Sequence, residues 1–462
     1  MNFKSGELNT FCQTIISGQT FTGNFVADRE RIETTLYSFD RPIELQSDDT
    51  LTLKSARLST ISLFQLFPSP AKRLSFQDRI PEAVHSNNIQ ANLALEGPEA
   101  WLLTEPVRSL SFAIPGASTI FENKEKFQLL KNPETASCSR ELFKIHTGNL
   151  SVVVAYSAKY DRLTGLLSNF KPHFTVDFDR PVDLMDYRRI INCIVAFCSL
   201  NLGVHLSAQN VRISKLSLAD IEAANKDGTF QTSFQVFQLQ SAESVRDEVT
   251  QRIISPFNCH NKHEIELLSA ALTKWISRSD NWYGTYALAM GAFGMQRTSG
   301  EQRLLNACKW LEEIPTAKAQ KSIDKTHINE IAKAACLKAE ELGLSHMEHR
   351  IPNALSRIRE ESRSTRFSRL ITHAWGRIGL PQGIDPTLSH LKKAYKFRNP
   401  AAHGYLDTSP SGSSKELLDA TEAMEALCFL LSLRELHEDD AVNNRVQLHP
   451  IVKAYRSVLF SE

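Results

Sequence analysis

The hydrophobic periodicity of the chain changes near residue 245, and this change limits the folds that the chain can adopt. Before it, short segments rich in strand-forming residues are separated by Pro and Gly. After it, apolar residues recur three and four positions apart, which is typical of amphipathic helices. We therefore predict an α+β protein with a β-rich N-terminal domain over 1–243 and an all-helical domain over 244–462.

The first half contains eight segments that read as strands, and one that does not. Asp183–Gly203 has apolar residues at helical spacing and ends in a glycine suited to stop a helix, so we predict a helix inserted in the β region. The predicted strand segments are Thr20–Ala27, Leu51–Phe67, Asn88–Leu95, Arg108–Gly116, Leu150–Ser157, His173–Asp179, Val204–Leu216 and Thr232–Leu239.

The second half reads as a bundle of five or more helices. A polar stretch over Pro315–Lys325 is predicted to link two of them. The helical segments are His263–Ser277, Glu301–Ile314, His327–Gly343, the strongly basic Ser356–Gly379, Thr387–Phe397 and Lys415–Leu436.

Net charge, cysteine spacing and apolar runs argue against a protein that is basic overall, a disulfide-linked secreted protein and a membrane-spanning protein. The net charge is +1, so any affinity for nucleic acid must come from a local surface. The eight cysteines form no CxxC pair, which indicates free and mostly buried thiols in a reducing, cytoplasmic setting. The first residues lack the apolar core of a signal peptide, and the most apolar run, Ile190–Gly203, is too short to span a bilayer.

Polar residues gather at a break in one helical segment, KFRNPAAHGYLD over Lys396–Asp407. Pro400 disfavours helical backbone at the residue before it, so we predict that the helix ends near Phe397–Asn399. Pro is well suited to the first turn of a new helix. If one begins there, Asn399 is its cap and His403 lies in its first turn.

That arrangement would place Arg398, Asn399 and His403 around a helix N-terminus, where free N–H groups and the helix dipole favour anions. Arg adds a planar donor for phosphate oxygens, and His adds a proton donor or acceptor near neutral pH. The preceding stretch is basic and suits a phosphodiester backbone. Its positive residues are Arg357, Arg359, Arg363, Arg366, Arg369, Arg377, Lys392, Lys393 and Lys396.

The residues alone leave a second interpretation open, in which Arg398 and Asn399 are solvated residues at a helix end and His403 is a packing residue with satisfied hydrogen bonds. Metal sites are not supported by the sequence. The CHNKH cluster at 259–263 has no partner pair at finger-like spacing, and the two histidines of HMEH at 346–349 lack the HExxH pattern. We expect no metal and no cofactor.

The heptapeptide RNPAAHG resembles the signature of HEPN domains, in which an Arg and a polar residue precede a His within a compact helical bundle. The β-rich half followed by RRIINCIVAFCSLNLG is similar to the N-terminal region of ApeA-like anti-phage HEPN proteins. The resemblance therefore extends over most of the chain. Pro400, directly after Asn399, departs from an undisturbed helix through the motif.

This resemblance implies a metal-independent endoribonuclease, paired as a homodimer or higher oligomer that brings two motifs together. Arg398, Asn399 and His403 would be catalytic, and Lys392, Lys393 and Lys396 would bind the RNA, with tRNA one candidate. It also implies a toxic effector in abortive anti-phage defence, with the β-rich domain sensing a phage trigger. The alternative is a non-catalytic RNA-binding, nucleotide-binding or dimerisation module.

Tyr405 extends the motif to Arg-x4-His-x-Tyr. In toxin-type HEPN proteins paired with a nucleotidyltransferase antitoxin, a Tyr at this place is modified. The resemblance thus implies such an antitoxin as one further partner. The other interpretation is that Tyr405 packs or stacks on a base.

Overall fold

The chain divides into two compact units that are interleaved in sequence. Unit 1 comprises Met1–Val195, Leu206–Gln251 and Asn258–Ser269, and unit 2 comprises Ala196–His205, Arg252–Phe257 and Ala270–Glu462. The predicted boundary between 243 and 244 lies outside the described residues. The computed structural model describes residues 7–28, 30–39, 42–47, 49–74, 84–131, 140–160, 167–228, 232–238, 250–295, 300–321, 323–358, 360–402 and 412–460.

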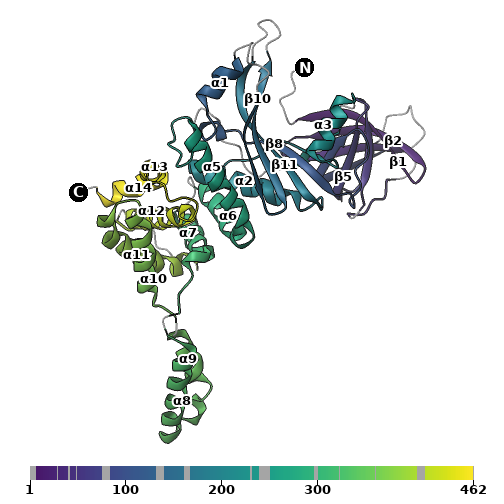
Figure 1. Cartoon of the computed structure of the whole chain (residues 1–462). Helices are drawn as coiled ribbons and strands as arrows, with labels where there is room; N and C mark the ends of the chain where they lie inside the picture. The colour runs from purple at the N-terminus through teal and green to yellow at the C-terminus, as the bar shows by residue number, and fades with distance from the viewer. Residues whose placement is uncertain are drawn as a thin grey trace. The chain divides into compact units, whose positions relative to one another are not determined.

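The predicted α+β class is confirmed, with an antiparallel sheet of thirteen strands in unit 1 and helices in unit 2 (Figure 1). The strands are β1 (Leu8–Ile16), β2 (Gln19–Ala27), β3 (Ile32–Phe39), β4 (Leu51–Ser55), β5 (Thr60–Pro68), β6 (Lys72–Leu74), β7 (Val84–Gly97), β8 (Val107–Ala113), β9 (Glu141–Thr147), β10 (Leu150–Tyr160), β11 (Leu167–Val182), β12 (Gln209–Ser214) and β13 (Phe234–Gln238).

Six strands of this sheet close into a ring. The order β3-β2-β1-β4-β5-β7 returns to its start because β3 also pairs with β7. Residues alternate between buried and exposed along β1 and β3, as the pleat requires. The buried set, which includes Phe25, Leu36, Leu53 and Leu63, forms one core inside the ring. Closure leaves no free edge between these strands.

The remaining strands continue from β7 in the order β13-β12-β8-β11-β10-β9. The predicted inserted helix is α2 (Tyr187–Leu202), and Gly203 after it has φ 65°, the left-handed conformation that stops a helix. Two shorter helices of unit 1, α1 (Lys124–Lys131) and α3 (Leu218–Lys226), were not predicted.

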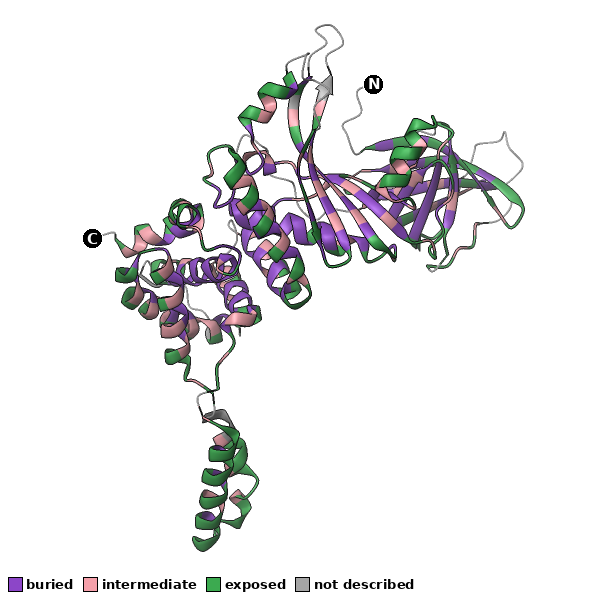
Figure 2. Cartoon of the chain, viewed as in Figure 1, coloured by how far each residue is buried: buried purple, intermediate pink, exposed green. Residues whose placement is uncertain are grey.

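Unit 2 is built around α12, whose residues from 420 to 433 are almost all buried (Figure 2). Helices α7, α10, α11 and α14 pack against it. The helices after α5 (Lys262–Ser277) are α6 (Ser279–Gly294), α7 (Gly300–Glu313), α8 (Lys325–Glu341), α9 (Arg350–Ile358), α10 (Arg363–Arg377), α11 (Ile384–Ala402), α12 (Gly412–Leu433), α13 (Asp440–Leu448) and α14 (Pro450–Leu459).

Helices α8 and α9 pack on each other and are mostly exposed (Figure 2). The segments that lead into and out of this helix pair are joined by a bridge between Lys321 and Glu360. The N–H of Glu361 also donates to the carbonyl of Gln320 at 2.9 Å. We call these paired segments the neck.

The structure differs from the sequence prediction in several segments. Residues 204–208 of the predicted strand Val204–Leu216 are not extended sheet, and Ser356–Gly379 divides between α9 and α10. Ser362 caps α10 by accepting from the N–H of Thr365, which starts a new helix at Arg363. Strands β1, β3, β6 and β9 and helices α6, α13 and α14 were not predicted, and α9 was predicted only from Ser356 onward.

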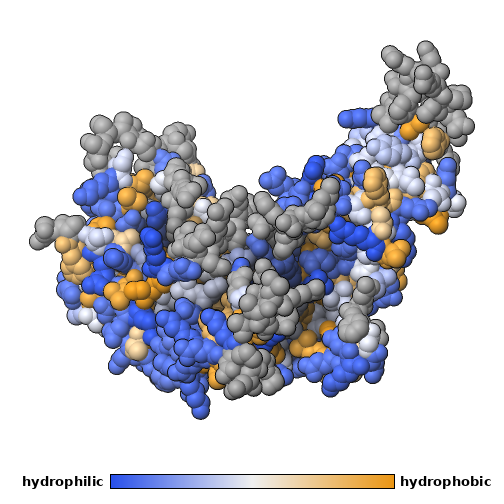
Figure 3. Space-filling view, turned by 90° about the horizontal axis from the view of Figure 1, so that it is seen from above, coloured by the Kyte–Doolittle hydropathy of each residue, from blue (hydrophilic) through white to orange (hydrophobic). Residues whose placement is uncertain are grey.

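Six of the seven described cysteines are buried free thiols, and Cys336 is half-buried. Among the described residues, no helix combines the length and the apolar character that a membrane crossing requires. The face of the molecule in Figure 3 is largely hydrophilic, with small scattered apolar areas.

Candidate functional site

The predicted break at Pro400 is absent, because α11 continues through this residue to Ala402. The prediction that Asn399 caps a new helix is therefore wrong, and no helix N-terminus lies at this position. A proline removes one backbone hydrogen bond and crowds the preceding turn. Here that cost falls on the last turn of α11, two residues from its end. The predicted anion binding can therefore rest only on side chains at this position.

The guanidinium of Arg398 makes a bidentate contact with the carboxylate of Glu312 on α7. Its Nη1 lies 2.7 Å from Glu312 Oε1, and its Nη2 donates to Oε2 at 3.1 Å. Both side chains are about one-third exposed, at 32% and 37%. The planar fork of the guanidinium matches a carboxylate in this way, and the contact fixes its orientation. Two of its five N–H groups face Glu312, which leaves others for a second anion.

Lys392, Lys396 and Asn399 recur four and three positions apart on α11 and are all exposed. We call this row the lysine stripe. Lys393 lies off the stripe, where its Nζ donates to Glu416 Oε1 at 2.9 Å. The opposite face of the helix is buried through Leu391 and its neighbours. The two lysines of the stripe are therefore the ones that face solvent without a described partner.

Beneath Arg398 lies a polar and aromatic layer. Tyr395 donates to Glu312 at 3.4 Å, and its ring is contacted by the guanidinium of Arg398 at 5.5 Å. Burial raises the pKa of Tyr395, so the phenol stays protonated. Burial likewise raises the pKa of the Cys308 thiol to about 12, which makes it a packing residue rather than a nucleophile.

The predicted basic surface upstream is smaller than the sequence suggests. Arg366 and Arg377 donate to backbone carbonyl oxygens, and Arg369 binds the carboxylate of Glu361. These three guanidiniums are at least partly committed to internal contacts. Sequence counts charges but does not show which of them the fold uses internally.

His403 and Tyr405 lie outside the described residues. The structure therefore places Arg398 and Asn399 of the predicted catalytic set, and the predicted convergence of Arg398 with His403 stays a prediction. Sequence reasoning missed Glu312. The signal available was its position on the predicted helix Glu301–Ile314, but nothing in the sequence indicates that α7 and α11 pack together.

No group of three or more His, Cys, Asp or Glu residues suited to hold a metal occurs in the part of the chain that the structure describes. No protein-family model matches the chain, and neither a curated protein nor a solved structure matches it.

Proposed function

We propose that this protein is a metal-independent endoribonuclease that cleaves RNA with Arg398, Asn399 and His403. The observation that carries the proposal is the geometry of Arg398, whose guanidinium is oriented by Glu312, on a helix that also presents an exposed row of cationic and polar side chains. A pre-oriented guanidinium with spare donors is suited to stabilise charge that develops on a phosphate.

The chemistry needs a nucleophile, a base and an acid. RNA supplies the nucleophile as its 2′-hydroxyl. His403 removes the proton from this hydroxyl, its oxygen bonds to phosphorus, and the bond from phosphorus to the 5′-oxygen breaks. The leaving oxygen takes a proton from an imidazolium, here the His403 of a second copy. The products are a 2′,3′-cyclic phosphate and a 5′-hydroxyl. Asn399 orients His403 or the phosphate.

The lysine stripe supports the substrate class. Lys392 and Lys396 lie one helical turn apart and face solvent, so they suit contact with consecutive phosphates. Each should contribute through counterion release. Lys392→Gln or Lys396→Gln should therefore weaken binding of any RNA sequence and lower the steepness of its salt dependence by about one ion.

The test is incubation of the full-length protein with tRNA and with mRNA in EDTA, followed by analysis of product ends. We expect cyclic-phosphate ends with the wild type and none with His403→Ala. Arg398→Ala should bind RNA and cleave it about 100-fold more slowly. Lys453→Gln, which removes an exposed charge from α14, is the matched control. Unchanged cleavage by His403→Ala would overturn the proposal.

The Arg398–Glu312 contact also favours a second candidate function, a non-catalytic module that binds RNA or nucleotide. In that case the ion pair is structural, since it joins α7 to α11. The wild type would then bind RNA without cutting it, and Arg398→Ala and Glu312→Gln would lower the melting temperature by similar amounts without a change in RNA products.

Homodimer formation and a role in defence belong to the same proposal. Light scattering of the purified protein tests the dimer, which a reaction using two copies of His403 requires. Phage plating on cells that express the wild type or His403→Ala tests defence. Equal plating of phage on the two strains would contradict the role in defence, whether or not the purified protein cleaves RNA.

A further inference from the structure

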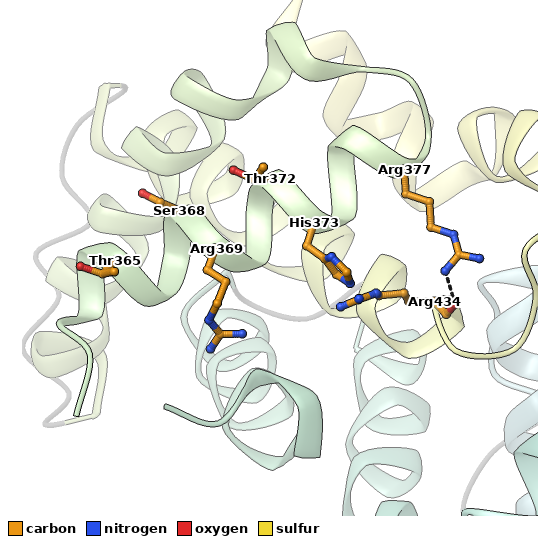
Figure 4. Close-up of a pocket in the computed structure, with 7 residues that line it drawn as sticks. All are labelled: Thr365, Ser368, Arg369, Thr372, His373, Arg377 and Arg434. Atoms are coloured by element: carbon orange, nitrogen blue, oxygen red, sulfur yellow. Dashed lines mark hydrogen bonds between the residues drawn. The ribbon is translucent and has the colours of Figure 1, made fainter. Parts of the chain in front are cut away.

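An open pocket of about 720 Å³ lies along one face of α10, with Arg434 just beyond the end of α12 (Figure 4). Ser368, Arg369, Thr372 and His373 of α10 contribute to its lining. They recur at helical spacing and so share a face. Phe367, on another face of α10, contacts Tyr395 of α11 instead. The pocket is therefore separate from the Arg398 site.

Positive charge dominates this pocket, through Arg369, Arg377 and Arg434. Arg377 donates to the backbone carbonyl of Arg434, as the dashed line in Figure 4 shows, and this bond keeps the two residues together. Burial and the nearby Arg369 lower the pKa of Arg434, against the effect of Glu435. The guanidinium of Arg434 has no hydrogen-bond partner among the described residues, which leaves its fork available.

Two carboxylates close to these arginines, Glu361 and Glu435, already have partners. Glu361 is only 7% exposed and is bound by Arg369, which also donates to the carbonyl of Lys318 at 3.1 Å. Glu435 lies 3.7 Å from Arg278. Of the three arginines, only Arg369 forms a described ion pair with a carboxylate, and the effect of Glu435 on Arg434 is shared with Arg278.

Neutral donors complete the lining. Ser368 and Thr372 also line the pocket, and the ring of His373 points toward the guanidinium of Arg434 (Figure 4). Nε2 of His373 is buried and has no hydrogen-bond partner among the described residues. A buried polar atom of this kind is costly unless something satisfies it.

We propose that this pocket binds a phosphorylated small molecule of nucleotide size through Arg434, Arg369 and His373. Its volume would admit a ligand of nucleotide size, although the pocket is open to solvent on one side. Planar guanidiniums bind phosphate oxygens in pairs, and hydroxyls can take the remaining oxygens or a sugar. The pocket lies apart from the lysine stripe, so RNA that follows the stripe does not need to enter it.

The test is calorimetric titration of the full-length protein with pyrophosphate, with ATP and, as the uncharged comparison, with adenosine. We expect pyrophosphate and ATP to bind and adenosine not to bind. Arg434→Gln removes a guanidinium that has no described hydrogen-bond partner, so the variant should fold. It should weaken both ligands about tenfold or more, as the loss of charge-assisted hydrogen bonds predicts. Ser368→Ala should weaken them less, and Lys453→Gln should have no effect.

Three results would each overturn the proposal. One is the absence of binding by both phosphate ligands, and another is equal affinity in the wild type and Arg434→Gln. The third is that Arg434→Gln weakens binding of a 20-nucleotide RNA but not of pyrophosphate or ATP, which would make the pocket part of the RNA-binding surface. Because the titration measures binding of small ligands, its result does not depend on whether the protein cleaves RNA.

Discussion

His449 gives a quantitative test of the helical unit through its response to pH. The side chain is 0% exposed and caps α14, where Nδ1 accepts from the N–H of Ile451 at 3.4 Å. Its ring stacks on Phe429 with centroids 4.1 Å apart. On another side it meets Gly203, since a Cβ there would lie 2.8 Å from the ring. Burial lowers the pKa of His449 to about 3.

The direction of the effect follows from this pKa. In the unfolded chain a histidine takes up a proton near pH 6.5, whereas folded His449 stays neutral until about pH 3. The stability that neutral His449 contributes is thus present above pH 6.5 and is lost as pH falls toward 3. Between pH 7 and pH 5 the loss is about 2 kcal/mol, since one pKa unit corresponds to about 1.4 kcal/mol.

Urea unfolding followed by tryptophan fluorescence measures this loss, because Trp275, Trp282, Trp310 and Trp375 all lie in unit 2. His449→Asn keeps a side-chain acceptor at the cap and does not titrate. It should be less stable than the wild type at pH 7, because it packs less well. Its further loss from pH 7 to pH 5 should be smaller than the wild-type loss by about 2 kcal/mol.

His437 stays in both proteins and cancels in this comparison. Its pKa is lowered to about 4, mainly by burial, so it adds a similar loss to each. His346→Asn, at an exposed position of the 3₁₀ turn at Ser345–Met347, is the control and should follow the wild-type pH curve. An equal loss between pH 7 and pH 5 in wild type and His449→Asn would refute the reasoning.

Two further predictions concern packing. Glu425 is 9% exposed and accepts two hydrogen bonds from Arg303, at 2.8 and 2.6 Å. Arg303→Met leaves this carboxylate unpaired and should lower the free energy of unfolding, measured in urea, by about 3 kcal/mol; adding Glu425→Leu should restore most of this loss. Full stability of the single variant would contradict this. Gly23→Ala places a Cβ 1.8 Å from a carbonyl oxygen of β3 and should lower the free energy of unfolding by about 3 kcal/mol. Gly18 has φ 78° and nothing near its Cβ position, so Gly18→Ala should lower it by only about 1 kcal/mol. Thermal unfolding measures both, and a reversed order would argue against the β2–β3 register.

The sequence predicts the fold class well because periodicity is a local property. Alternation marks most strands, and the glycine after α2 ends that helix as expected. It does not predict that β3 returns to pair with β7, since that contact joins residues about fifty positions apart. The missed strands β1 and β3 belong to this closed ring.

The candidate site shows a similar division. The exposed positions of Lys392 and Lys396 follow from helical spacing, and the residue types at 398 and 399 are visible in the sequence. The break at Pro400 was predicted from a local backbone preference, which the packing of α11 overrides. The pairing of Arg398 with Glu312 depends on which helices pack together, and one sequence carries no record of that.

The neck has a consequence for how the helical unit is organised. The bridge between Lys321 and Glu360 means that the chain leaves the bundle and returns to it at one place. The intervening helices are thus not needed to carry the backbone from η2 (Pro315–Ala317) to α10. Their length and sequence are free to change while the bundle keeps its register, as is common for insertions at closely spaced backbone positions. Helices α8 and α9 should therefore be left out when the bundle is superposed on other helical bundles.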